Sequence, residues 1–322
     1  MSRYTISVVI TTFNRPECLD TAIQSVVAQT RPPDEIIVVD EGESAPTRAV
    51  VDKYPGVRYV WKEDDGPSGA RNAGLALASG DLINFLDDDD WFLPRKLEIQ
   101  AALFESHPEA DVVYCRLRKV TPDQQFLGEY LTNHRPPKDF LLSLLRENFI
   151  LTHSALVRRK SLKAVGGFDP DRDSSEEYEG WIRMALAGAN FLFCDEVLGA
   201  VRVSPGSLSS NRYSMFKKIE KGYRRNREAL RPFRDRAGRE WWMAGPAYNR
   251  GRYALENGDL SIARESLKQA LHHNPLHGHA LMYLAFSMLP GQLRRLLLSA
   301  RSLKRYAVSV LTRILGGESR WT

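Results

Sequence analysis

The stretch LINFLDDDDW, residues 82–91, joins a continuous apolar run to four consecutive aspartates. An apolar run of this length is typical of a strand that is buried on both faces of a parallel sheet. Three similar runs precede it along the chain, at residues 6–10, 35–39 and 57–61. Among these runs, apolar residues recur at helical spacing at 18–29 and 70–78. This alternation of strands and helices predicts an α/β fold with a mostly parallel sheet flanked by helices.

Acidic residues follow two of the predicted strands. Asp40 ends the second strand, and the four aspartates at 87–90 end the fourth. Ligands of open parallel sheets bind beyond the carboxyl ends of the strands. We therefore expect both acidic strand ends to lie on one rim of the sheet and to form a site.

The four adjacent aspartates repel one another unless a positive group neutralises them. An acidic helix cap is one explanation, because a helix is expected to begin near Leu93 and Pro94, but a cap needs only one aspartate. The other explanation is Mg²⁺ or Mn²⁺, which binds carboxylate oxygens and bridges them to phosphate oxygens. A cation held in this way can neutralise a departing diphosphate. The run therefore predicts a divalent metal site.

Four segments of the chain belong together as a pattern. They read SVVITTFNRP at 7–16, EIIVVDEG at 35–42, GPSGARNAGLALASGDLINFLDDDDWFLPRKL at 66–97 and GGFDPDRDSSEEYEGWIRMALAG at 166–188. In this order they strongly resemble the family 2 glycosyltransferases. The resemblance implies the Rossmann-like GT-A fold. It also implies an enzyme that transfers a sugar, with inversion, from a nucleotide-diphosphate sugar to an acceptor, with a UDP-sugar as the first choice of donor.

The resemblance assigns residues of the first half to donor binding. Thr11 and Phe13 match positions that line the nucleotide pocket, and Asp40 matches the aspartate that binds the base. Glu41 stands where the family commonly has a second aspartate. Arg71 matches a donor-binding arginine, whose fixed charge and planar fork suit a phosphate or a base.

The aspartate run covers the family's Asp-x-Asp position. The resemblance implies that Asp88 contacts the ribose and that Asp89, with Asp87, holds Mn²⁺ or Mg²⁺. Because four aspartates stand in a row, the register of this assignment stays open by one residue.

A second acidic cluster supplies candidates for the catalytic base. In the family a Glu-Asp pair opens a helix, and its second acid deprotonates the acceptor hydroxyl. Glu176 and Glu177 occupy that place, so Glu177 stands where an aspartate is usual. Glu176, Glu179 and Asp173 remain alternatives to Glu177 as the base. An acid-rich helix start, favoured by the helix dipole, is the alternative without a catalytic role.

The second half of the chain is polar, basic and helical in pattern. We expect a GT-A domain at 1–210, a basic helical connector at 211–240, a tetratricopeptide-like helix pair at 241–290 and a basic amphipathic helix at 291–322. The helix pair is indicated by a turn at Asn257, Gly258 and Asp259 and by spacing close to the tetratricopeptide pattern. The last helix has an apolar side and a basic side, which is typical of an interfacial helix, with an ordinary packed helix as the alternative.

Composition bears on the cellular location of the protein. Its 322 residues carry a formal net charge of +5, and its three cysteines form neither a metal pattern nor a disulfide framework. The N-terminus reads as a strand and not as a signal peptide, and no apolar run reaches the length of a membrane-spanning helix. We expect a cytoplasmic protein, with the inner face of the cell membrane as a candidate peripheral location. The expected partners are a nucleotide-diphosphate sugar, a glycan or lipid-linked acceptor and an anionic membrane surface, and no nucleic acid.

These features predict a metal-dependent glycosyltransferase of surface polysaccharide or lipopolysaccharide biosynthesis. A nucleotidyltransferase is one alternative, but it should carry a glycine-rich phosphate loop after the first strand, where TTFNRPE stands. The other is a non-catalytic nucleotide-sugar-binding or scaffold protein that acts through its helical repeat region. The unusual Glu177 favours that alternative, and the intact donor-side residues oppose it.

Overall fold

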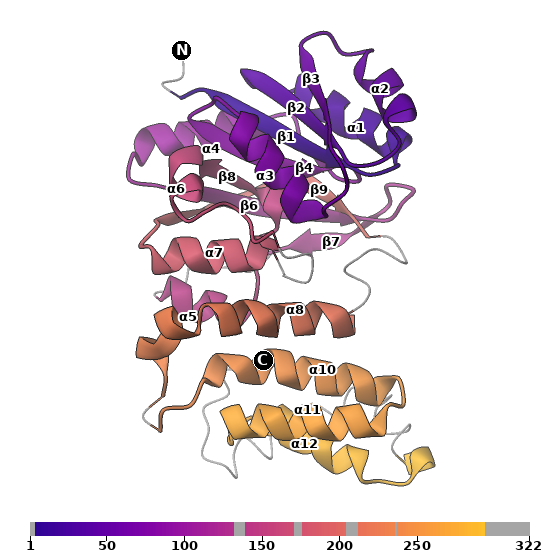
Figure 1. Cartoon of the computed structure of the whole chain (residues 1–322), viewed down its shortest axis with the longest axis vertical. Helices are drawn as coiled ribbons and strands as arrows, with labels where there is room; N and C mark the ends of the chain where they lie inside the picture. The colour runs from indigo at the N-terminus through magenta and orange to yellow at the C-terminus, as the bar shows by residue number, and fades with distance from the viewer. Residues whose placement is uncertain (1–3, 132–138, 171–175, 204–211, 236, 294–322) are drawn as a thin grey trace. The chain divides into compact units, whose positions relative to one another are not determined.

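The computed structural model describes residues 4–131, 139–170, 176–203, 212–235 and 237–293. The chain divides into two compact units, Met1–Ser207 and Leu208–Thr322 (Figure 1). From residue 294 onward, the predicted amphipathic helix lies outside the described residues, as does Asp173. The two units are taken in turn.

One sheet organises the first unit. In the described part of the chain its nine strands are β1 (Ile6–Thr12), β2 (Glu35–Asp40), β3 (Val57–Trp61), β4 (Leu82–Asp87), β5 (Trp91–Phe92), β6 (Val112–Val120), β7 (Phe126–Tyr130), β8 (Ala155–Arg158) and β9 (Phe191–Arg202). Their order is β3-β2-β1-β4-β8-β6-β9-β5, with β7 paired to β6. The first four strands of this order are parallel, which confirms the four strands expected from the apolar runs. Beyond β4 the sheet is mixed, because β8 runs antiparallel to both β4 and β6.

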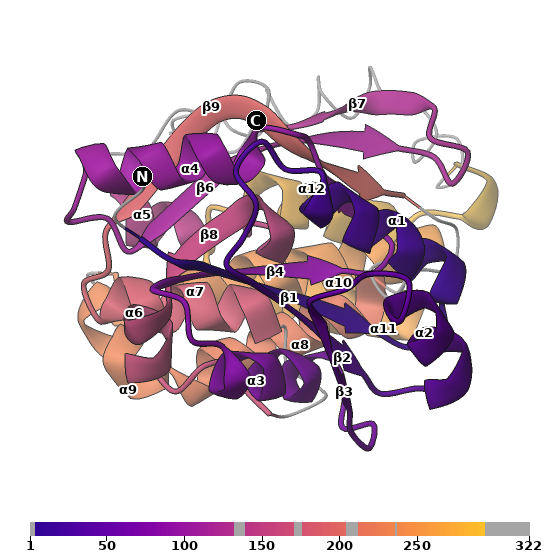
Figure 2. The same ribbon diagram turned by 90° about the horizontal axis from the view of Figure 1, so that it is seen from above.

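Helices cover both faces of this sheet. They are α1 (Pro16–Val27), α2 (Ser44–Val51), α3 (Pro67–Leu77), α4 (Lys96–Ser106), α5 (Phe140–Leu144), α6 (Arg159–Ala164) and α7 (Glu176–Leu186). Figure 2 shows α1 and α4 on one face and α3 and α7 on the other. Because β1 is buried along its whole length, its apolar residues pack against both layers. The predicted α/β class with helices on both faces is therefore confirmed.

The strand register decides where the functional edge lies. Thr12 of β1 is paired with Asp40 of β2, and Thr11 is paired with Asp87 of β4. The carboxyl ends of the three strands therefore meet at one edge of the sheet, as the sequence predicted.

A close approach of α3 to β1 aims one side chain at this edge. A Cβ atom on Gly74 would lie 2.3 Å from Val9 Cγ1, so only glycine lets the helix sit this near the strand. Arg71 lies three residues earlier, on the same face of α3 as Gly74. The tight contact therefore directs Arg71 towards the end of β4.

The second unit is helical in its described residues. It contains α8 (Arg212–Arg225), α9 (Arg227–Leu230), η3 (Arg231–Phe233), η4 (Trp241–Met243), α10 (Ala244–Glu256), α11 (Leu260–His273) and α12 (Gly278–Ser287). Helix α8, expected within a connector, packs against α10 and so forms part of this unit. None of the described helices is long and apolar enough to cross a membrane.

Helices α10 and α11 form the pair expected at 241–290. They meet at the turn around Gly258, whose φ of 92° is a left-handed conformation that favours glycine. A Cβ atom on Gly251 would lie 2.7 Å from Leu267 Cγ, so the two helices pack closely there. Kinship with tetratricopeptide repeats stays a prediction.

A buried histidine caps α12. His277 Nδ1 accepts a hydrogen bond of 3.1 Å from the backbone N–H of Ala280. Burial lowers the pKa of His277 to about 4, with a smaller contribution from the charge of His279. His277 is therefore neutral in the folded unit at neutral pH, as its acceptor role requires.

Acid should loosen α12 through this cap. As the pH falls below about 6.5, His277 becomes protonated in the unfolded chain but stays neutral in the folded unit. The stability that neutral His277 supplies is therefore complete above that pH and is lost progressively towards pH 4. At pH 5 the loss should be about 2 kcal/mol. Hydrogen exchange of the α12 amides at pH 7.5 and pH 5 measures it. His277→Asn keeps a capping side chain without the titration, so an equal loss of protection in both proteins would contradict the assignment.

Candidate active site

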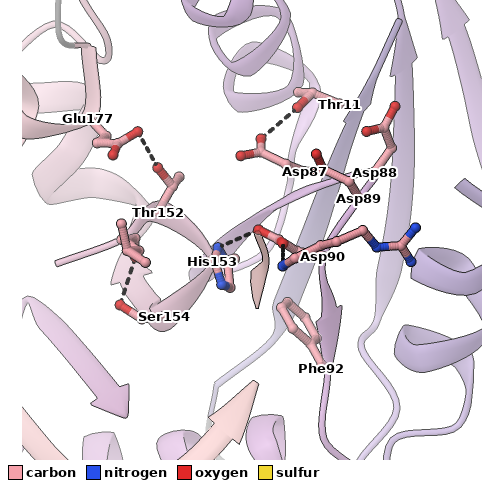
Figure 3. Close-up of polar contacts among 12 residues, drawn as sticks. Thr11, Asp87, Asp88, Asp89, Asp90, Phe92, Thr152, His153, Ser154 and Glu177 are labelled. Atoms are coloured by element: carbon pink, nitrogen blue, oxygen red, sulfur yellow. Dashed lines mark hydrogen bonds and ion pairs between the residues drawn. The ribbon is translucent and has the colours of Figure 1, made fainter. Parts of the chain in front are cut away.

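Threonine–aspartate hydrogen bonds tie β1 to β4 at the shared strand edge. Thr11 Oγ1 donates to Asp87 Oδ1 over 3.2 Å, as Figure 3 shows. Thr12 Oγ1 donates to Asp88 Oδ2 over 2.7 Å. Thr11, predicted to line the nucleotide pocket, therefore contacts the aspartate run directly.

The four aspartates divide into an outward pair and an inward pair. The side chains of Asp87 and Asp89 are 33% and 24% exposed. Asp88 and Asp90 are buried. Only the outward pair, which is also the predicted metal pair, is accessible to a ligand in this conformation. Asp88 is held by Thr12, and its contact with a ribose stays a prediction.

Arg71 connects the two acidic clusters of the sequence. Its Nη2 donates to Asp87 Oδ1 over 2.8 Å, and its Nη1 lies 4.0 Å from Glu177 Oε2. Thr152 Oγ1 donates to the same oxygen of Glu177 over 3.0 Å, as Figure 3 shows. The predicted base and the predicted metal ligand Asp87 thus share one buried arginine.

The charge of Arg71 also sets the state of Asp87. Burial by itself raises the pKa of Asp87, but the charge and hydrogen bond of Arg71 outweigh burial, so the pKa lies below its usual value. Asp87 is therefore an ionised carboxylate at neutral pH, as a metal ligand must be.

Arg15 is a site residue that the sequence did not single out. Its Nη2 lies 2.6 Å from Asp88 Oδ1, and its Nη1 donates to Asp89 Oδ2 over 2.6 Å. Burial raises the pKa of Asp88 to about 7, against the opposing charge of Arg15. The sequence indicated only that four adjacent carboxylates need a positive group nearby. It did not identify Arg15 as the residue that provides this charge.

A buried pair forms the floor below the aspartate run. Asp90 Oδ2 lies 3.1 Å from His153 Nδ1 (Figure 3). Asp90 Oδ1 accepts from the backbone N–H of Arg202 over 2.9 Å. Burial, with the charges of Asp89 and Asp87, raises the pKa of Asp90 well above its ordinary value. Burial lowers the pKa of His153 to about 4. Both directions favour the neutral forms of Asp90 and His153, and a neutral Asp90 carboxyl can donate to His153 Nδ1.

Phe13 and Asp40, both predicted to bind the donor, differ in their exposure to solvent. Phe13 follows β1 and is 49% exposed, so its ring is available to a ligand. Asp40 has no exposed surface, and its two oxygens accept from Gly42 N–H and the Tyr59 hydroxyl, each over 2.9 Å. In this conformation Asp40 shapes the edge through these two groups, and its contact with a base stays a prediction.

The structure separates the candidates for the base. Glu179 is buried, and both of its oxygens accept from Nε of Arg183 on the same helix at 2.8 Å, so Glu179 is already engaged within α7. The side chain of Glu176 lies outside the described part of the chain. Glu177 is the acid of this cluster that the described residues bring to Arg71 and Asp87.

Comparison with known proteins decides the family. Residues 7–166 match the family described as glycosyl transferase family 2. The uncharacterized glycosyltransferase YwdF of Bacillus subtilis is 31% identical over 188 residues, which cover 56% of this chain and 68% of the relative. The chain belongs to glycosyltransferase family 2. It is accordingly a glycosyltransferase, and the nucleotidyltransferase alternative is wrong.

Solved structures confirm the GT-A fold. Residues 1–349 of S. aureus TarS, in complex with UDP-GlcNAc, match with a TM-score of 0.64 and 19% identity over 98% of this chain and 93% of that one. The mannosyltransferase PcManGT of Pyrobaculum calidifontis, in complex with GDP-Man and Mn²⁺, matches with a TM-score of 0.57 and 16% identity over 98% of this chain and 88% of that one.

The neutral state of Asp90 can be tested by amide substitution. Asp90→Asn keeps the shape and can donate to His153, so it should change the free energy of unfolding by less than about 1 kcal/mol. Asp87→Asn removes the charge that accepts from buried Arg71 over 2.8 Å and should cost about 3 kcal/mol. Urea unfolding of both variants measures the difference. A loss of several kcal/mol in Asp90→Asn would show that Asp90 is ionised.

Proposed function

We propose that this glycosyltransferase moves a sugar from a nucleotide-diphosphate sugar, with a UDP-sugar as first choice, to an acceptor hydroxyl with inversion. The proposal assigns Mn²⁺ or Mg²⁺ to Asp89 and Asp87, donor binding to Thr11, Phe13, Asp40, Arg71 and Asp88, and the base to Glu177, with Glu176 as the alternative. The observation that carries it is the position of Arg71 between Asp87 and Glu177, because it brings a metal-side carboxylate and a base into one site.

The outward aspartates suit a hard divalent cation. The contacts of Asp87 to Thr11 and Arg71 use Oδ1, and the contact of Asp89 to Arg15 uses Oδ2, so among the described residues each carboxylate keeps one oxygen without a partner. No three His, Cys, Asp or Glu side chains within the described ranges are grouped to hold a metal. Cations such as Mg²⁺ commonly take one or two carboxylates and complete their shell with substrate phosphates. When bound here, the cation would neutralise charge on the departing diphosphate.

The chain's own residues supply the proton transfer. Thr152 fixes the direction of Glu177 by donating to Oε2, and Arg71 Nη1 lies 4.0 Å from the same oxygen. Glu177 takes the proton of the acceptor hydroxyl while that oxygen bonds to the anomeric carbon. The bond from this carbon to the diphosphate oxygen breaks on the opposite side, which inverts the configuration. Arg71 stays in place during this step, so the site needs little reorganisation.

The acceptor and location follow as further parts of the proposal. We assign a glycan or lipid-linked acceptor, as in surface polysaccharide or lipopolysaccharide biosynthesis, and a cytoplasmic location with peripheral contact to an anionic membrane surface. The basic residues of α8 support this assignment, because they suit phosphate-bearing or lipid partners. A scaffold acting through the helical unit is the competing proposal.

Donor binding and turnover test the assignment together. Calorimetry with a panel of nucleotide sugars, with and without Mn²⁺, should find one donor that binds with metal. Asp89→Asn should abolish the metal-dependent part of this binding. Glu177→Gln should bind the donor normally and lower turnover by about 10²- to 10⁴-fold, the usual contribution of a positioned base.

Two exposed acids provide matched controls for that experiment. Asp123→Asn and Glu109→Gln remove the same charges from exposed positions outside the site and should change neither binding nor turnover. If no nucleotide sugar binds with any metal, the catalytic proposal fails and the scaffold proposal replaces it.

Arg15 should compete with the metal for Asp89. Because its guanidinium lies 2.6 Å from both Asp88 and Asp89, a cation must displace it or share these carboxylates. Arg15→Gln should therefore tighten Mn²⁺ binding without nucleotide by about tenfold, which corresponds to about 1.4 kcal/mol. Electron paramagnetic resonance of free Mn²⁺ measures the affinity. Arg58→Gln, at an exposed position on β3, is the control, and unchanged or weaker binding in Arg15→Gln would contradict the competition.

A further inference from the structure

Asn72 follows Arg71 on α3 and contacts a part of the chain that the proposed reaction does not use. Its Nδ2 donates to the carbonyl oxygen of Phe168 over 2.8 Å, and its Oδ1 accepts from the backbone N–H of Phe168 over 2.8 Å. The side chain thus satisfies both backbone groups of one residue, as a neighbouring strand would. Asn72 therefore holds the backbone at Phe168, 96 residues away in the sequence, at a fixed position relative to α3.

The loop that carries Phe168 packs tightly against α3. Gly167 has a φ of 70°, a left-handed conformation that favours glycine. A Cβ atom on Gly167 would lie 2.6 Å from Asn72 Oδ1 and 3.2 Å from Leu75 Cδ2, so no side chain fits between the loop and the helix. The Phe168 ring is buried and packs edge-on against Phe85 of β4, with the ring centres 5.0 Å apart. Polar and apolar contacts together fix the loop on α3.

The same loop is bonded to the helix that carries the proposed base. Arg183 of α7 donates through Nη2 to the carbonyl oxygen of Gly167 over 2.7 Å, and through Nη1 to the carbonyl oxygen of Val165. Its Nε donates to both oxygens of Glu179, one turn earlier on α7, at 2.8 Å. Because Arg183 is bonded both to the loop and to its own helix, the position of α7 depends on the position of the loop.

Two routes therefore connect Glu177 of α7 to α3. The direct route is the approach of Arg71 Nη1 to Glu177 Oε2, which at 4.0 Å is longer than a hydrogen bond. The second route runs from Asn72 through the loop 165–168 to Arg183, and its hydrogen bonds are 2.7 to 2.8 Å long. The second route consists of short, directional bonds, so it fixes the separation of the two helices more firmly than the direct route.

We propose that Asn72 is a positioning residue for the base of the transfer reaction. By holding the loop 165–168, it keeps α7 at the distance from α3 at which Glu177 reaches the acceptor hydroxyl. The inference rests on the proposed function, because it requires Glu177 to act as the base. A small displacement of a catalytic group can lower turnover by up to about 10²-fold, so loss of these two hydrogen bonds should be visible in the rate.

Hydrolysis of a nucleotide sugar measures this effect without a known acceptor, because water can replace the acceptor hydroxyl. The donor is the member of a panel of UDP-glucose, UDP-GlcNAc and GDP-mannose that the full wild-type chain hydrolyses fastest with Mn²⁺. Asn72→Ala removes both hydrogen bonds to Phe168, so hydrolysis should slow by about tenfold or more. The Kd of the donor, measured by calorimetry, should change by less than about twofold, because Arg71 and the aspartates remain.

Asn257→Ala is the matched control. It is the same substitution at an asparagine of the helical unit whose Nδ2 also donates to a backbone carbonyl, that of Tyr253, over 2.9 Å. It should change neither the rate nor the Kd. If Asn72→Ala weakens donor binding as much as it slows hydrolysis, Asn72 acts through Arg71 and not through the base, and the proposal is overturned. Wild-type hydrolysis by folded Asn72→Ala also overturns it.

A double-mutant cycle assigns the loss to the base. If Asn72 acts through Glu177, Asn72→Ala should slow the Glu177→Gln enzyme by less than about twofold, because the contribution of Asn72 disappears with the base. An equal slowing in both backgrounds would overturn this inference and leave the proposed function standing. If Glu177→Gln hydrolyses the donor as fast as wild type, or if wild type hydrolyses no donor, the proposed function fails and this inference fails with it.

Arg183→Lys breaks the same route at its other end and keeps the test valid if Asn72→Ala does not fold. Lysine has a single ammonium group instead of a planar fork, so it cannot keep the bonds to the loop and to Glu179 together. Hydrolysis should again slow at an unchanged donor Kd, and this loss should again vanish in the Glu177→Gln background. Circular dichroism checks that each variant is folded. Wild-type hydrolysis by folded Arg183→Lys would overturn the proposal.

Discussion

The site of this glycosyltransferase depends on how a protein holds four adjacent carboxylates at the end of one strand. Like charges this close are tolerated only when cations, hydrogen bonds or protonation offset their repulsion. The chain uses all three. Arg71 and Arg15 contact Asp87, Asp88 and Asp89, and the threonines of β1 donate to Asp87 and Asp88. Burial raises the pKa of Asp90 well above its ordinary value, which favours its protonated form beside His153. The position of the proposed base follows from the same constraint, because the arginine that offsets Asp87 also lies beside Glu177.

The division of the run into inward and outward carboxylates explains why one sequence motif serves both fold and chemistry. Asp88 and Asp90 are buried and join β1, η1 (Thr152–Ser154) and β9 to the strand end. Asp87 and Asp89 remain accessible. Without Asp88 and Asp90, the strand end that carries Asp87 and Asp89 would lose its hydrogen bonds to β1, η1 and β9. Strand β4 ends at Asp87, and Asp88 and Asp89 lie in a turn that the backbone N–H of Asp90 closes by donating to the Asp87 carbonyl over 3.1 Å. This turn, and not the alternation of an extended strand, separates the outward carboxylates from the inward ones.

Much of the fold was predictable because its signals are local. The apolar runs predicted β1 to β4, and strand order then placed Asp40 and the aspartate run at one edge. The contacts of Arg15 and His153 could not be predicted, because each joins segments that are far apart in the sequence. The burial of Asp40 could not be predicted either, since its tyrosine partner comes from β3.

In the helical unit, the basic pattern of residues 211–240 indicated a helical connector, whereas Glu220 of α8 is buried against Arg250 of α10. The sequence shows which residues are charged, but only the packing of the helices determines which of these residues form buried ion pairs.

The two units use the same physical device for different purposes. In each, a buried arginine donates to a carboxylate: Arg71 to Asp87, and Arg250 to Glu220. A rigid, partly satisfied polar group stabilises a ligand better than a flexible one, because its orientation is already fixed before binding. Sugars present many hydroxyls and few charges, so an enzyme gains selectivity from such fixed acceptors more than from net charge.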